Sequence, residues 1–280
     1  MSFSFALISD VFHQQDGADR LRAHLATAKK QGASLAVLPE LPCNPWSPAT
    51  KTPRDDDAET LESGGRVFMQ ADAAREAGIA LLGGILQKLH DGTRRNTAIL
   101  FNQQGQIAAT YSKMHLPEEP GFWETSHYEA GNEPPRAISD VLPIRVGMQI
   151  CSDINRPEGC HLLGADGAQL ILAPRATEQA TWQRWRPVLM ANAVTSCAFV
   201  ASVNRPREEQ GVLIGGPSFV VTPNLEVLLE STDTVATVTI DTSAIEHAKV
   251  EYPGYLPVRA DVYARAWQRI ADRVSEVPRP

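Results

Sequence analysis

One stretch of the chain reads Val146-Gly147-Met148-Gln149-Ile150-Cys151-Ser152-Asp153-Ile154-Asn155-Arg156-Pro157-Glu158, an apolar strand that ends in a turn and leads into a helix. Pro157 suits the first turn of that helix, because the N–H that proline lacks has no partner there. Cys151 is thus held at the end of a rigid element, where the following backbone amides can face a bound molecule. Cysteine is commonly a small buried hydrophobe. The polar pair Ser152-Asp153 favours a reactive thiol instead.

Two charged residues occupy matching positions elsewhere in the chain. Glu40 ends the apolar run 33–39, and Lys113 follows the apolar-rich segment 96–111. Alone, Glu40 could cap a turn and Lys113 could be a solvated surface lysine. Three reactive groups at three strand ends nevertheless suggest a single site.

Strand-like and helix-like runs alternate along the chain, the pattern of an α/β layered domain. A first strand begins near the N-terminus, and Asp16 can cap the first helix. Helices are predicted at 16–30, 58–77, 157–166, 178–196 and 259–274, and further strands at 79–86, 96–101, 107–111, 170–173, 198–203, 216–221, 226–229 and 235–240. The chain has neither an internal repeat nor a low-complexity segment.

Composition excludes several classes of protein. The formal net charge of −7 over 280 residues argues against a nucleic-acid or anionic-membrane partner. No segment approaches the ~20 apolar residues of a membrane span, and the N-terminus lacks a basic region followed by an apolar core. We therefore expect a cytoplasmic protein. Its thiols are expected to be reduced, because its four cysteines show neither metal-ligand spacing nor the density of a disulfide scaffold.

The order Glu40, Lys113, Cys151 in these contexts resembles the carbon-nitrogen hydrolase (nitrilase) superfamily. The resemblance runs from the first strand to about Ile240. Its most specific stretch is Lys113-Met114-His115-Leu116-Pro117-Glu118-Glu119-Pro120-Gly121-Phe122-Trp123-Glu124, which is similar to a segment of N-carbamoylputrescine amidases.

The resemblance implies an α/β fold of a particular kind, the four-layer α-β-β-α sandwich of the nitrilase type. It implies a single carbon-nitrogen hydrolase domain over residues 1–280, with about 250–280 as a C-terminal arm. It also implies homo-oligomers and chemistry that needs no cofactor and no metal. The aromatic and proline-rich segment 252–257, followed by an amphipathic stretch, suits an arm that packs on a partner or on its own body.

Roles for the site residues follow from the chemistry of amide hydrolysis. Cys151 would attack as a thiolate, which we expect to form more easily beside a cation. Glu40 would be the general base. Lys113 and the backbone N–H of Ser152 would hold the oxyanion. On the resemblance, Glu124 is the second catalytic carboxylate, although Glu118 and Glu119 lie nearer to Lys113 in sequence and compete for that role.

Two further residues are candidates for contact with substrate. His115 is predicted beside the site as a hydrogen-bonded support. Arg175 follows the buried strand 170–174 at the level of Cys151, where its guanidinium could bind a carboxylate and favour an acidic substrate. It could equally pair with a local acid such as Glu178.

These features predict a thiol-dependent hydrolase that cleaves the C–N bond of a small linear amide or N-carbamoyl compound and releases ammonia. A nitrilase or an acyl-transfer enzyme with the same triad is an alternative, as is a catalytically silent binding member of the fold. Nitrilases proper typically show Cys-Trp-Glu, so Cys151-Ser152-Asp153 puts nitrile hydrolysis in second place.

Overall fold

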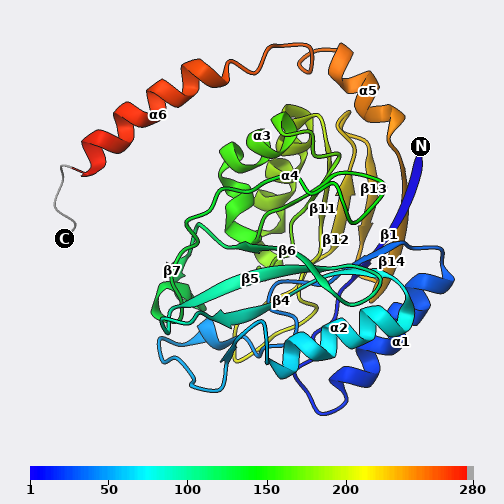
Figure 1. Cartoon of the computed structure of the whole chain (residues 1–280), viewed down its shortest axis with the longest axis vertical. Coiled ribbons are helices and arrows are strands. Elements are labelled where there is room, and N and C mark those ends of the chain that lie inside the picture. Colours follow the sequence, from blue (N-terminus) through cyan, green and yellow to red (C-terminus); the bar gives the residue numbers. More distant parts are fainter. Residues whose placement is uncertain (276–280) are drawn as a thin grey trace.

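Two β-sheets stack face to face in the computed structural model, which describes residues 1–275 (Figure 1). The first sheet has the order β14-β1-β2-β4-β5-β6, with β3 beside β4. It comprises β1 (Ser2–Ile8), β2 (Leu35–Val37), β3 (Ala58–Glu59), β4 (Ala80–Lys88), β5 (Arg94–Phe101), β6 (Ile107–Ser112) and β14 (Val235–Asp241). The second sheet, in the order β13-β12-β11-β10-β9, comprises β9 (Val146–Met148), β10 (Leu170–Leu172), β11 (Phe199–Ser202), β12 (Ser218–Val221) and β13 (Val227–Ser231).

Helices cover the outer face of each sheet. The pair α1 (Gly17–Lys30) and α2 (Gly65–Ala77) lies on the first sheet, and the pair α3 (Pro157–Ala165) and α4 (Trp182–Ser196) lies on the second (Figure 1). One apolar cluster fills the space between the sheets. A second lies between the first sheet and its helices, and a third between the second sheet and its helices. The four-layer α-β-β-α sandwich is therefore confirmed.

Alternation along the strands decides which layer each side chain enters. In β1, Phe5 and Leu7 face the core between the sheets, whereas Ala6 and Ile8 face the helices. Successive side chains of a strand point to opposite faces, so each strand of a sheet covered on both sides needs apolar residues throughout. The buried strands β2 and β10 show this pattern.

The predicted helix over 58–77 was wrong in its first third. Ala58–Glu59 instead form the short strand β3 alongside Leu86 of β4, and α2 starts at Gly65. The Glu59 carboxylate accepts the backbone N–H of Val67 (2.8 Å), so it caps the first turn of the helix from outside. Gly78 ends the helix in the left-handed conformation, as its sequence position suggests.

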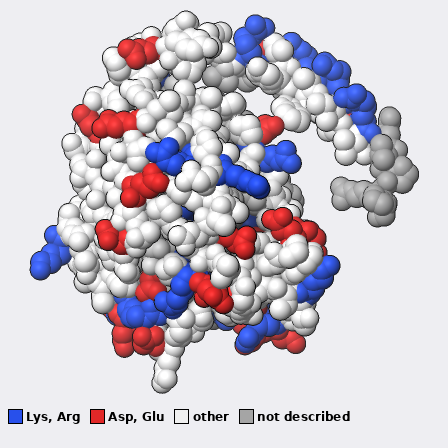
Figure 2. All heavy atoms as spheres, turned by 180° about the vertical axis from the view of Figure 1, so that it is seen from behind, with Lys and Arg blue, Asp and Glu red and all other residues white. Residues whose placement is uncertain are grey.

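The C-terminal segment leaves the sandwich. After α5 (Ser243–Val250) the chain runs to α6 (Ala260–Ser275), which extends away from the body, and Figure 2 shows basic residues along it. A stripe of apolar side chains on α6 is exposed, formed by Tyr263, Trp267, Ile270 and Val274. Within residues 1–275, no helix combines the length and apolar composition that crossing a membrane would need.

Two small elements complete the neighbourhood of the site. Strands β7 (Glu118–Glu119) and β8 (Phe122–Trp123) form a hairpin, and the short 3-10 helix η2 (Glu124–Ser126) follows it. A second 3-10 helix, η3 (Cys151–Asn155), lies between β9 and α3. The two 3-10 helices carry three of the predicted site residues, Glu124, Cys151 and Ser152.

Candidate active site

Three buried charged groups meet at one end of the sheets. The Lys113 ammonium nitrogen lies 2.7 Å from Glu40 Oε1 and 2.7 Å from each carboxylate oxygen of Glu124. All three residues are at most 2% exposed. One lysine thus binds two carboxylates that are 84 residues apart in sequence, and two negative charges share one positive charge away from water.

Cys151 lies on a strained turn at the start of η3. Its φ is 48°, in the left-handed region that a residue with a side chain seldom adopts. The turn is held by the Cys151 N–H, which donates to the carbonyl of Pro174 (2.8 Å), and by the thiol, which lies 3.7 Å from the carbonyl oxygen of Ala176. The segment that follows β10 therefore fixes the direction of the sulfur.

Asp153 joins the cysteine turn to the segment that carries Lys113. Its buried carboxylate accepts the backbone N–H groups of Ile150, Met114 and His115, and also the Tyr111 hydroxyl (2.9 Å). These hydrogen bonds tie the carboxylate to the backbone of two separate segments. Asp153 consequently fixes the relative positions of Lys113 and Cys151.

Asn96 is a site residue that sequence reasoning missed. Its side-chain amide donates to Glu40 Oε1 (2.7 Å), the oxygen that also receives Lys113. The other oxygen, Glu40 Oε2, is buried without a hydrogen-bond partner within residues 1–275. The clue in the sequence was a polar residue within a strand that is otherwise buried. Glu40 therefore keeps one oxygen free to take a proton.

The thiol of Cys151 is neutral at rest. Burial raises its pKa well above the ordinary value, and the negative charges of Glu40 and Glu124 raise it further, whereas Lys113 opposes them. As expected, the charge of Lys113 lowers the pKa of the thiol, but burial and the two carboxylates together outweigh it, so the free site does not favour a thiolate. Attack by this sulfur requires a base.

The pKa of Glu124 is raised to about 7, first by burial and then by the charge of Glu40, against the opposing effect of Lys113. The pKa of Lys113 is raised above its usual range, since the attraction of both carboxylates overcomes its own burial. The lysine therefore stays charged at neutral pH, whereas Glu124 lies close to proton uptake.

Glu118 and Glu119 do not join this cluster. Both are exposed on β7, and the Glu118 carboxylate accepts hydrogen bonds from Thr125 and Ser126. Lys113 instead contacts Glu124. The hairpin β7-β8 reverses the chain direction between Lys113 and Glu124. Spacing along the sequence could not show this reversal.

Ser152 and His115 lie beside Cys151 and bind to each other. The Ser152 hydroxyl donates to the backbone carbonyl of His115, and the His115 ring nitrogen Nδ1 lies 2.8 Å from Asp153. The imidazole is partly exposed. These contacts fit His115 as a hydrogen-bonded support, and its contact with substrate stays a prediction.

Arg175 is buried on the helix side of the second sheet. Its guanidinium donates to Ser202 Oγ (2.7 Å) and to the carbonyl of Pro217, and lies 5.0 Å from the ring centre of Trp182. In the described part of the chain it forms no ion pair, so the alternative of a partnership with Glu178 is not realised. Burial lowers its pKa to about 10.

Apolar side chains pack around the three charged groups. They flank the functional residues in sequence, since Leu41 follows Glu40, and Phe122 and Tyr128 bracket Glu124. The cluster consists of Leu41, Trp46, Leu86, Phe122, Tyr128, Ala176, Val212 and Ile214. The burial of the three charged groups themselves strengthens the electrostatic interactions among them.

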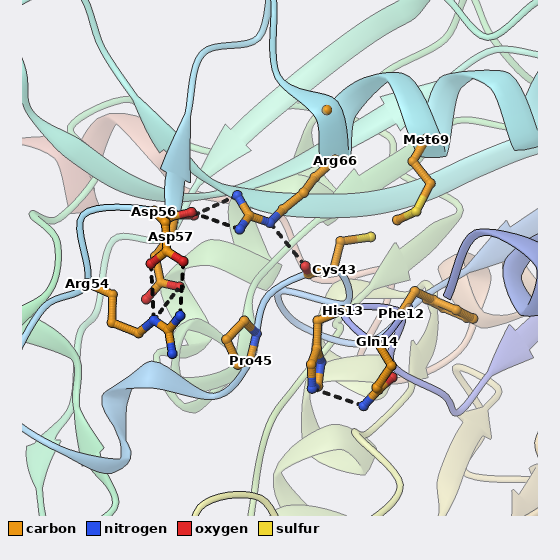
Figure 3. Close-up of a pocket in the computed structure, with 11 residues that line it drawn as sticks. Phe12, His13, Gln14, Cys43, Pro45, Arg54, Asp56, Asp57, Arg66 and Met69 are labelled. Carbon is orange, nitrogen blue, oxygen red and sulfur yellow. Dashed lines mark hydrogen bonds and ion pairs between the residues drawn. The ribbon is translucent and has the colours of Figure 1, made fainter. Parts of the chain in front are cut away.

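The other cysteines lack this setting. Burial raises the pKa of Cys160 to about 12, and it packs against the helix side of the second sheet. Cys43 lines a separate cavity of about 500 Å³ on the outer side of the loop that follows Glu40, where its carbonyl receives the Arg66 guanidinium (3.2 Å) (Figure 3). At Cys151, by contrast, the charge of Lys113 acts on the thiol and lowers its pKa.

Fold and site together define a class of protein, the thiol hydrolases built on an α-β-β-α sandwich in which one lysine joins two carboxylates beside a cysteine. The chain belongs to the carbon-nitrogen hydrolase family, whose model, described as "Carbon-nitrogen hydrolase", matches residues 9–250.

Individual relatives agree with this assignment. An omega-amidase of Homo sapiens is 28% identical over 274 residues, which cover 94% of this chain and 97% of that protein. An amidase from Nesterenkonia sp. has a similar structure, with a TM-score of 0.74, 25% identity and coverage of 95% of this chain and 96% of that chain. A carbon-nitrogen hydrolase from Helicobacter pylori shares the fold, with a TM-score of 0.82, 21% identity and coverage of 95% and 99%.

Proposed function

We propose that this protein is a thiol-dependent hydrolase that cleaves the C–N bond of a small linear amide or N-carbamoyl compound through a Cys151 acyl-enzyme. The observation that carries the proposal is the buried cluster in which Lys113 binds Glu40 and Glu124 at 2.7 Å while Glu40 Oε2 stays unpaired. The thiol, the carboxylate and the ammonium can supply the nucleophile, the proton acceptor and the oxyanion donor that amide hydrolysis requires.

In acylation, Glu40 Oε2 takes the Cys151 proton as the sulfur attacks the carbonyl carbon. The oxyanion that forms is stabilised by the Lys113 ammonium and by the backbone N–H of Ser152. When the tetrahedral intermediate collapses, the C–N bond breaks and Glu40 returns the proton to the leaving nitrogen. Ammonia departs and a thioester on Cys151 remains.

Deacylation reverses these roles with water as the nucleophile. Glu40 removes a proton from the water as it attacks the thioester carbon, and the same donors hold the second oxyanion. The C–S bond then breaks and the sulfur regains a proton. An amide yields its carboxylic acid, and an N-carbamoyl compound yields a carbamic acid that loses carbon dioxide.

Amides are favoured over nitriles and over N-carbamoyl compounds as substrates. The similar human protein is named an omega-amidase and the similar solved structure is an amidase. The buried aromatic and aliphatic cluster around Glu40 and Glu124 favours a short acyl group. The small Ser152 beside the thiol differs from the tryptophan at this position in nitrilases.

Release of ammonia from a panel of primary amides, ureido acids, ureido amines and nitriles tests the proposal. We expect turnover of at least one short amide, together with a mass increase on Cys151 that matches the acyl group in rapidly quenched samples. A variant with Cys160→Ala controls for the other buried thiols and should keep full activity. No turnover and no adduct across the panel would favour a silent binding protein.

We further propose that Arg175 favours anionic substrates. Its charge is buried without an acid partner in residues 1–275, and it is near enough to interact electrostatically with Cys151. Because the guanidinium is 1% exposed, it would act through its electric field more than through direct hydrogen bonds. Arg175→Ala should weaken turnover of an anionic ureido acid while sparing a cationic ureido amine. Equal effects on both would limit Arg175 to a structural role.

Homo-oligomerisation is also part of the proposal, with residues 1–280 as a single carbon-nitrogen hydrolase domain in which about 250–280 form a C-terminal arm. The exposed apolar stripe of α6 supports it, because such a stripe on a helix that leaves the body is typical of an interaction surface. A second copy of the chain is the partner that we propose.

A further inference from the structure

A buried arginine from the second sheet binds the loop that carries Glu40. Arg205 is 0% exposed and follows β11. Its Nη1 donates to the backbone carbonyls of Glu40 (2.9 Å) and Leu41 (2.7 Å), and its Nη2 donates to the carbonyl of Asn44 (2.9 Å). One side chain thus holds three carbonyls of a single loop, across 161 to 165 residues of sequence.

The other edge of the guanidinium is held by Glu209. Arg205 Nε lies 2.8 Å from Glu209 Oε1, and Nη2 lies 2.6 Å from Glu209 Oε2, a two-point pairing. The Glu209 backbone closes a hairpin turn with Val212, so the carboxylate is itself fixed. All five guanidinium N–H groups therefore have an acceptor, which gives the arginine one orientation.

The loop held in this way is strained. Leu41, directly after Glu40, has a φ of 47°, a left-handed conformation that a leucine does not adopt without support. Arg205 binds the carbonyls of Glu40 and Leu41, one on each side of the Leu41 Cα atom. The strained turn and the two hydrogen bonds together determine where the Glu40 side chain leaves the backbone.

We propose that Arg205, supported by Glu209, is a positioning residue that holds Glu40 at the distance and angle needed for proton transfer. This inference rests on the proposed role of Glu40 as general base. A shift of about 1 Å in a reacting group can reduce a rate about a hundredfold, so loss of the clamp should act on catalysis more than on substrate binding.

The test compares Arg205→Lys and Glu209→Gln with wild type, using a short amide that the enzyme turns over. Lysine keeps the charge but has three donors in place of five, and glutamine keeps the shape of Glu209 without its charge. Arg20→Lys is the matched control, because Arg20 also ties a loop, after β1, through Asp10 and the Val11 carbonyl. Rates are expressed per Cys151 thiol of folded protein, with the folded fraction taken from thermal melts, so unfolded protein does not count.

We expect kcat to fall about 10- to 100-fold in Arg205→Lys with KM nearly unchanged, and less in Glu209→Gln. Acylation and deacylation should slow together, since Glu40 serves both steps. Arg20→Lys should lower the melting temperature without changing kcat. In a Glu40→Gln background, Arg205→Lys should have little further effect, because the residue that it positions is already disabled.

An unchanged kcat per thiol in both variants would overturn the inference, as would full additivity with Glu40→Gln. If Arg205→Lys does not fold, Glu209→Gln and its double variant with Glu40→Gln decide the question. Failure of the proposed function is distinguishable, because in that case wild type would show no turnover, or Cys151→Ala would itself retain it.

Discussion

The catalytic cluster and the C-terminal arm depart from the usual distribution of residues in opposite directions. In the cluster, Lys113, Glu40 and Glu124 are almost fully buried, although charged side chains normally face water. In the arm, Trp267 and Tyr263 are more than half exposed, although large apolar side chains are normally inside. The buried charges are stabilised by one another within the chain. The exposed rings have no comparable partner in the described chain, which is why we propose that a second copy covers them.

The cluster depends first on its nucleophile, and its loss should have the largest effect. Cys151→Ala should reduce turnover by about four orders of magnitude or more. The fold should persist, because the thiol is neutral and its removal leaves no unpaired charge. Steady-state ammonia release and thermal melting check both parts. Wild-type activity in the alanine variant would remove Cys151 from the chemistry.

Glu40→Gln keeps the size of the side chain and removes the base. We expect substrate to bind normally while acylation slows by about 10²- to 10⁴-fold, the usual contribution of a positioned acid or base. Rapid-quench measurement of thioester formation and decay reports each step. Unchanged rates for both steps would mean that another group moves the proton.

Lys113→Ala tests whether mutual pairing keeps the cluster stable. It should slow acylation by about 100-fold or more through loss of the oxyanion donor. It should also reduce the free energy of unfolding by about 3–5 kcal/mol, since two buried carboxylates lose their counter-ion. Urea denaturation and single-turnover kinetics measure the two effects. Lys51→Ala is the control, because Lys51 is exposed and lies over the ring of Trp123. It should change neither the acylation rate nor the free energy of unfolding.

The pH dependence of kcat/KM, which reports the groups of the free enzyme, tests the cluster through a smaller change. The pKa of Glu124 is about 7, so acidification through pH 7 adds a proton and weakens its hold on Lys113. Activity should therefore fall as the pH decreases through this range, up to tenfold per unit for one proton. In Glu124→Gln the rate should be low throughout and this acidic limb should disappear. An acidic limb that is identical in wild type and Glu124→Gln would assign it to another group.

Changes in the arm should leave the chemistry nearly untouched. Replacing Trp267 and Ile270 by serine removes the centre of the apolar stripe, and light scattering should then show a smaller assembly with kcat per thiol nearly unchanged. Arg265→Ser lies on the opposite side of the helix and should leave the assembly intact. A wild-type protein that is monomeric at micromolar concentration would contradict the proposed role of the arm.

Most of the strand and helix positions could be predicted, because apolar periodicity and helix-ending glycines are local properties. The error over 58–64 arose where a long-range contact prevailed: β3 pairs with β4, and Glu59 caps α2 from outside. Residues such as Asn96 and Arg205 were missed for the same reason. Each is an ordinary polar residue until the partner that it binds is known.

Local sequence patterns alone predict the order of the elements, the cysteine at a strand-to-helix turn and the placement of Glu40 and Lys113 after apolar runs. Tertiary structure decided that Lys113 binds Glu124 and not the nearer Glu118, and that Arg205 reaches Glu40 from the other sheet. It also decided that the thiol rests in its neutral form, because pKa values depend on burial and on all nearby charges. Local patterns fix what each segment forms, whereas the packing of the two sheets fixes which charges share a site.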